Sequence, residues 1–139
     1  MKNKFNIWDY LYYRATLYYN KTETKLGFED NKRRGSYTVG LLISLNVESL
    51  IMLIILLFLN RTPFLLDYMG YLIVCVFLII IFYTIYLFEK KRHIQIFNRY
   101  KNESNIERKK RNIFLGAYIT FTIILFFLAV SLGRTLWVW

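Results

Sequence analysis

Three long apolar runs dominate the pattern of hydrophobic and polar positions along the chain. They cover residues 37–59, 69–88 and 113–132. Each run reaches the roughly 20 residues that a helix needs to cross a bilayer core of about 30 Å. The pattern therefore predicts an all-α integral membrane protein with three transmembrane helices, in which residues 36–139 form the transmembrane domain.

The polar pattern of residues 1–35 predicts a separate N-terminal segment. It lacks the apolar core of a cleaved signal peptide, so we expect it to be retained. Apolar and aromatic side chains recur in it at helical spacings of three and four, which predicts an amphipathic helix. These side chains are Phe5, Trp8, Leu11, Tyr12, Ala15, Tyr18 and Tyr19. Because aromatic rings favour the headgroup boundary, we expect this helix on the membrane surface; the alternative is packing against the spans.

The connection at residues 89–112 also has a helical pattern. Ser104 and Glu107 have the spacing of a capping box, which marks the start of a helix near Asn105. No Gly or Pro interrupts residues 87–101, so the second span is expected to continue beyond the membrane. The two extensions predict a basic helical hairpin that stands off the membrane as a stem.

Basic residues predict the orientation of the spans. Residues 1–35 carry eight Lys or Arg and residues 89–112 carry nine, whereas the other connection and the tail contribute only Arg61 and Arg134. The positive-inside rule therefore predicts a cytoplasmic N-terminus, a cytoplasmic stem and a periplasmic C-terminus in a bacterial inner membrane.

Composition narrows the class of protein further. The 139 residues are 56% hydrophobic with a net charge of +10, which excludes disorder and a soluble domain of this size. The single cysteine, Cys75, and the single histidine, His93, lie at different predicted depths, so they form no catalytic pair or metal site. No phosphate-binding glycine loop or hydrolase motif occurs. We therefore expect no enzymatic activity, no metal and no cofactor.

A polar face of the first span carries the most informative residue, Glu48. Ser36, Gly40, Ser44 and Glu48 recur every four residues and share one helix face. A charge near the midplane costs about 2.5–3.5 kcal/mol, so such a residue faces a bundle interior or an aqueous path. Beyond it the face becomes apolar, an arrangement that can gate by dewetting. The predicted pore lining is Ser36, Gly40, Ser44, Glu48, Met52, Ile55 and Leu59. The alternatives are that Glu48 joins helices or couples transport to protons.

Basic residues of the stem form a candidate anion-binding surface. The predicted ligand-binding residues are Arg92, Arg99, Lys101, Arg108, Lys109, Lys110 and Arg111. They would attract the phosphates of a nucleotide or short oligonucleotide, while His93, Phe97 and Tyr100 could stack on its bases. The alternative is that these charges only set topology and attract anionic lipid.

Three short sequences carry a resemblance to known proteins: Trp8-Asp9-Tyr10-Leu11-Tyr12-Tyr13-Arg14, Glu89-Lys90-Lys91-Arg92 and Asn102-Glu103-Ser104. With the short pair of spans, they resemble small bacterial inner-membrane proteins. In overall design the chain resembles membrane effectors of nucleotide-signalling anti-phage operons. That resemblance implies a homo-oligomer of three or more copies, with a tetramer favoured. Its first span would line a pore, and its ligand would be a nucleotide or oligonucleotide made by a partner nucleotidyltransferase.

Other membrane protein classes fit less of the pattern. Small multidrug transporters also carry a glutamate in their first span, but they have four spans and almost no cytoplasmic extension. The usual three-span phage holin has its N-terminus outside. Two functional alternatives to a channel or membrane-disrupting effector remain. One is a non-conducting anchor or accessory subunit that docks a soluble cytoplasmic partner, and the other is a small proton-coupled transporter that uses Glu48.

Overall fold

The computed structural model describes residues 5–22, 27–58 and 63–137, and every regular element in them is helical. A short π-helical segment, η1, separates the third and fourth α-helices. The elements are α1 (Ile7–Thr22), α2 (Phe28–Phe58), α3 (Pro63–Ile85), η1 (Tyr86–Arg92), α4 (His93–Tyr100) and α5 (Asn105–Trp137).

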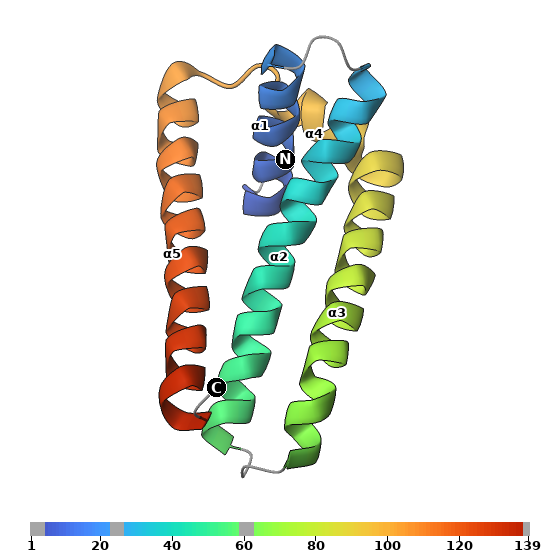
Figure 1. Ribbon diagram of the computed structural model, residues 1–139. Helices are drawn as coiled ribbons and strands as arrows, with labels where there is room; N and C mark the ends of the chain where they lie inside the picture. Colours follow the sequence, from blue (N-terminus) through green and yellow to red (C-terminus); the bar gives the residue numbers. More distant parts are fainter. Residues whose placement is uncertain (1–4, 23–26, 59–62, 138–139) are drawn as a thin grey trace.

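The long helix α2 lies at the centre, with α3 on one side and α5 on the other (Figure 1). These three helices are long and apolar enough to cross a membrane, over Asp30–Leu56, Gly70–Phe88 and Asn105–Gly133. The predicted set of three apolar helices is therefore confirmed. Of the three, α2 is the most buried, because it contacts α1, α3 and α5.

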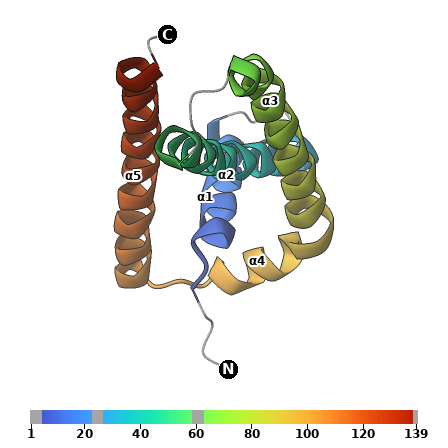
Figure 2. The same ribbon diagram turned by 90° about the horizontal axis from the view of Figure 1, so that it is seen from below.

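The remaining elements gather at one end of the bundle, which we call the head: α1, η1, α4 and the turn to α5, residues 7–22 and 86–104. Figure 2 shows α4 crossing from the end of α3 toward the start of α5, and α1 packs against α2. Aromatic and aliphatic side chains from these elements, together with Val39 and Leu42 of α2, form the main buried cluster. They are Tyr10, Leu11, Tyr12, Tyr13, Val39, Leu42, Phe88, Ile96 and Tyr100.

The packing of α1 differs from the expected position on the membrane surface. Leu11 and Tyr12, which were expected to face lipid, are 4% and 0% exposed inside the protein, whereas Tyr18 is 64% exposed. The amphipathic surface helix is therefore not confirmed, and α1 packs against other helices of its own chain. Gly35 makes this close approach possible, because a Cβ there would collide with side-chain atoms of Thr16 and Tyr12.

The connection between α3 and α5 also differs from a hairpin that stands off the membrane. The helix start is as predicted: Ser104 Oγ accepts a bond from the Glu107 amide, and Glu107 Oε2 accepts one from the Ser104 amide, both at 3.3 Å. However, α4 folds across the head, where Ile96 and Tyr100 are each only 1% exposed. The stand-off hairpin is therefore not confirmed, because burial of the apolar face of α4 holds it against α1.

Candidate functional site

Asp9 is a buried acid at the centre of the head. It is 0% exposed, and its Oδ2 atom accepts hydrogen bonds from Arg92 Nη2 and Arg99 Nη1, each at 3.0 Å. The arginines are seven residues apart, so two helical turns place them on one face. The other oxygen, Oδ1, is covered and has no hydrogen-bond partner among the described residues. Burial therefore raises the pKa of Asp9, although both guanidinium groups oppose this shift.

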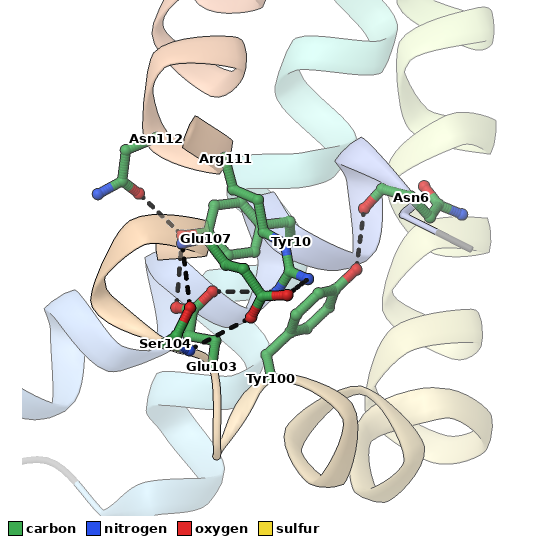
Figure 3. Close-up of polar contacts among 8 residues, drawn as sticks. All are labelled: Asn6, Tyr10, Tyr100, Glu103, Ser104, Glu107, Arg111 and Asn112. Carbon is green, nitrogen blue, oxygen red and sulfur yellow. Dashed lines mark hydrogen bonds and ion pairs between the residues drawn. The ribbon is translucent and has the colours of Figure 1, made fainter. Parts of the chain in front are cut away.

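A second polar cluster closes the head beside the turn from α4 to α5 (Figure 3). The Tyr10 hydroxyl donates to Asn112 Oδ1 at 2.9 Å, and it lies 3.5 Å from Glu103 Oε1. Arg111 Nη1 donates to Glu103 Oε2 at 3.1 Å, and its guanidinium lies 5.1 Å from the centre of the Tyr100 ring. Burial, helped by the Glu103 carboxylate, raises the pKa of Tyr10 to about 12.

The seven predicted ligand-binding residues divide into two groups. Arg92 and Arg99 bind Asp9, and Arg111 binds Glu103, so these three arginines contact acids of their own chain. The other four side chains are exposed: Lys101, Arg108, Lys109 and Lys110. The sequence did not predict that Asp9 binds Arg92 and Arg99 and so competes with an anionic ligand for these two side chains. The sequence feature that could have indicated this contact is an acid placed between two aromatic residues, Trp8 and Tyr10.

A groove of about 400 Å³ runs between α1 and α4 on the surface of the head. Its lining residues are Tyr13, Leu17, His93, Ile94, Phe97, Asn98 and Lys101. His93 Nδ1 lies 2.8 Å from the Tyr12 hydroxyl, and the His93 and Phe97 ring centres are 4.5 Å apart. Two of the three predicted base-stacking rings therefore line the groove. The third, Tyr100, is buried in the head instead.

Most of the predicted pore-lining residues lie inside the single chain. Ser36 and Ser44 are 0% exposed and Ile55 is 7% exposed. Gly40 packs against α3, because a Cβ there would come within 2.6 Å of Thr84 Oγ1 and 3.4 Å of Ile81 Cα. Met52 and Glu48 are half-buried. Leu59 lies outside the described residues.

Glu48 has no hydrogen-bond partner for its covered Oε1 atom among the described residues. Asn46 does not hydrogen-bond Glu48, because residues two positions apart on an α-helix, such as these, are about 200° apart around the helix axis. Asn46 Nδ2 instead lies 3.0 Å from Thr122 Oγ1 in α5 and also bonds the Tyr118 hydroxyl. Asn46 thus makes the polar contact between the first and third predicted spans. The covered Oε1 atom of Glu48 takes no part in it.

The described residues contain no group of three His, Cys, Asp or Glu side chains placed to hold a metal ion. Comparisons with protein-family models, with curated proteins and with solved structures found no match.

Proposed function

We propose that this chain forms a homo-oligomeric ion channel or membrane-disrupting effector in a bacterial inner membrane. The observation that carries the proposal is Glu48, whose covered carboxyl oxygen has no hydrogen-bond partner among the described residues, inside the apolar helix window Asp30–Leu56. An unsatisfied polar group in hydrocarbon costs several kcal/mol, so in this proposal a movement of α2 brings the carboxyl to water in a pore or to a group from another copy.

Oligomerisation is required because three helices cannot enclose a water-filled path. The outer helices α3 and α5 expose large side chains, among them Tyr71, Ile79, Phe82, Phe121 and Phe127, each at least 59% exposed. In a membrane such faces contact lipid or neighbouring copies. We favour an assembly of three or more copies, with a tetramer as the leading candidate, in which α2 approaches a shared axis.

In this proposal Glu48 and Met52 face the shared axis, since both are half-buried in the single chain. Ser36, Gly40 and Ser44 are buried against the chain's own helices, so they join the lining only when α2 rotates relative to α3. Such a rotation would switch the path between a narrow apolar state and a polar one. The carboxylate at Glu48 would then favour cations.

The head would control this switch by binding a nucleotide or oligonucleotide made by a partner nucleotidyltransferase, as in anti-phage defence. Exposed Lys101 lines the groove between α1 and α4, together with the rings of His93 and Phe97. Cations attract phosphates and aromatic rings stack on bases, so this groove has the chemistry for such a ligand. The N-terminus and the head would be cytoplasmic and the C-terminus periplasmic.

The test is cation flux from liposomes that contain the full chain, measured alone and with cyclic dinucleotides. Glu48→Gln removes the charge at nearly constant shape and is expected to reduce the preference for cations over anions. The matched control is Ser49→Ala, because the Ser49 hydroxyl already donates to Leu45 O of its own helix at 2.6 Å. Identical flux in wild type and Glu48→Gln under every condition would contradict a pore at Glu48.

A non-conducting anchor or accessory subunit is the second candidate. It is favoured by the burial of Ser36, Gly40 and Ser44 within one chain, which leaves little of the predicted pore face free. In that case the groove of the head would dock a soluble partner. No flux under any condition, together with a protein that co-purifies with wild type but not with Phe97→Ala, would favour this candidate over the channel.

A further inference from the structure

A small cavity lies where the first turn of α1 meets α2 and the end of α3. Its volume is about 180 Å³, and its lining includes Trp8, Ile43, Ile80, Tyr83, Leu87 and Arg92. For comparison, an apolar cavity of about 150 Å³ admits a benzene molecule. This cavity is therefore large enough for a stretch of hydrocarbon chain.

The lining changes from apolar to charged along α3 and η1. Ile80 and Leu87 lie within or at the end of the apolar window Gly70–Phe88, and Arg92 follows one helical turn after that window. Trp8 and the 61% exposed Tyr83 also line the cavity. Trp and Tyr rings with a nearby Arg are the side chains that favour the headgroup level of a membrane. The cavity therefore spans the boundary between hydrocarbon and headgroups.

Charge at the polar end favours an anion. Arg92 and Arg99 share the single carboxylate of Asp9, so the three groups together carry one net positive charge when Asp9 is ionised. A guanidinium has five N–H donors in a fork that suits phosphate oxygens. The bond from Arg92 Nη2 to Asp9 also fixes the guanidinium beside the cavity. A phosphodiester with one negative charge would balance the excess.

We propose that this cavity binds one anionic phospholipid, with a segment of its acyl chain between Ile43 and Ile80 and its phosphate at Arg92. The apolar lining explains why the phosphate belongs to a lipid and not to a soluble ligand. The site uses the membrane placement of the proposed function, but it does not depend on ion conduction. It also differs from the groove between α1 and α4, which is lined by His93 and Phe97 and contains neither Trp8 nor Arg92.

Trp8 provides a direct probe, because it lines the cavity. The full chain with Trp137→Phe and Trp139→Phe keeps Trp8 as its single tryptophan and is reconstituted in nanodiscs of phosphatidylcholine. A small fraction of either phosphatidylglycerol or phosphatidylcholine with brominated acyl chains is then added, since bromine quenches tryptophan on contact. We expect apparent affinity for the brominated phosphatidylglycerol to be about fivefold higher, the effect of one basic side chain near an anionic lipid.

Arg92 and Arg99 form a matched pair of variants, because both bind Asp9 but only Arg92 lines the cavity. Arg92→Gln should abolish the preference for phosphatidylglycerol. Arg99→Gln lowers the net charge equally but leaves the Arg92 guanidinium at the cavity, so it should reduce the preference less, and Arg92→Lys should retain it. Ile43→Phe, which fills the cavity, should reduce quenching by both lipids. Excess glycerol 1-phosphate should leave the quenching unchanged.

Four results would overturn the site. Equal quenching by the two lipids would show that the cavity has no preference for an anionic lipid, while leaving the membrane placement intact. Equal loss of the preference in Arg92→Gln and Arg99→Gln would attribute it to the net charge of the head and not to a site at Arg92. Competition by glycerol 1-phosphate would show that Arg92 binds a soluble phosphate and not a lipid. Absence of quenching by either lipid would contradict both the site and the membrane placement. Ion flux, measured separately, tests the channel alone.

Discussion

The Oδ2 atom of Asp9 lies 3.0 Å from Nη1 of Arg99, a contact between residues 90 positions apart in the sequence. The same oxygen binds Arg92, so one carboxylate joins α1 to both η1 and α4. This buried cluster, together with the aromatic side chains around it, fixes α1 in the head. The head is thus a packed unit in which Asp9 binds two of the cations that were predicted to bind a ligand.

The pH dependence of stability should report which force dominates at Asp9. Burial raises its pKa above the ordinary value of 3.8, so protonation is easier in the folded state than in the unfolded state. The sign follows from linkage: its contribution is fully present below the unfolded pKa and is lost as pH rises through the folded pKa. Relative to Asp9→Asn, the wild type should therefore gain stability as pH falls toward 4, measured as the unfolding free energy. A relative loss in acid would mean that the two arginines outweigh burial.

Alkaline pH should loosen the head through Tyr10. Its pKa is raised to about 12, so stability that is complete below the unfolded value of 10.0 is lost as pH rises through about 12. Spectroscopic titration of tyrosinate should show a step near pH 12 that is missing in Tyr10→Phe, accompanied by loss of the wild-type fold. If Tyr10→Phe removes a step near pH 10 instead, the phenol is not buried as described.

The approach of α3 to α2 should depend on Gly40. Gly40→Ala places a Cβ within 2.6 Å of Thr84 Oγ1, and such overpacking typically costs about 1–3 kcal/mol. Gly116→Ala is the matched control, because a Cβ there meets nothing within 4 Å. Unfolding of the detergent-solubilised protein by sodium dodecyl sulfate would measure both. Equal stability of the two variants would show that α2 and α3 do not pack at Gly40.

The contact between α2 and α5 should be measurable at Asn46 and Thr122. Their side chains bond at 3.0 Å, and hydrogen bonds between membrane helices contribute about 0.6 kcal/mol on average and up to about 1.7. A double-mutant cycle of Asn46→Ala and Thr122→Ala should give a coupling free energy in this range. The same cycle between Asn46 and Thr120, an exposed residue of α5, should give none. Equal coupling in the two cycles would place Asn46 away from Thr122.

The helices themselves were predictable because their signals are local. Apolar runs at 37–59, 69–88 and 113–132 locate α2, α3 and α5, and Ser104 with Glu107 marks the start of α5 at Asn105. The start of α2 was not predictable in this way, since the helix begins at Phe28, nine residues before the apolar run. A helix can continue through polar residues outside the hydrocarbon core of the bilayer. An apolar run therefore locates the span but does not show where the helix begins.

The site was less predictable because its contacts are long-range. An apolar face with aromatic rings has the same pattern whether it meets lipid or protein, so the burial of Leu11 and Tyr12 could not be read from α1 alone. Likewise, nothing local to Arg92 or Arg99 shows that both side chains bind Asp9. Gly40 was one position of a predicted polar face, yet in the structure it is a point of close approach between α2 and α3.

The mass of the protein particle in lipid nanodiscs is the most direct test of the central claim. An oligomeric pore requires more than one copy, because the described part of one chain contributes α2, α3 and α5 as candidate spans and three helices do not surround a path. We predict a particle of three or more copies, with four favoured, after the lipid and scaffold masses are subtracted. A dimer would favour exchange transport at Glu48, and a monomer would contradict the channel because three helices cannot enclose a pore.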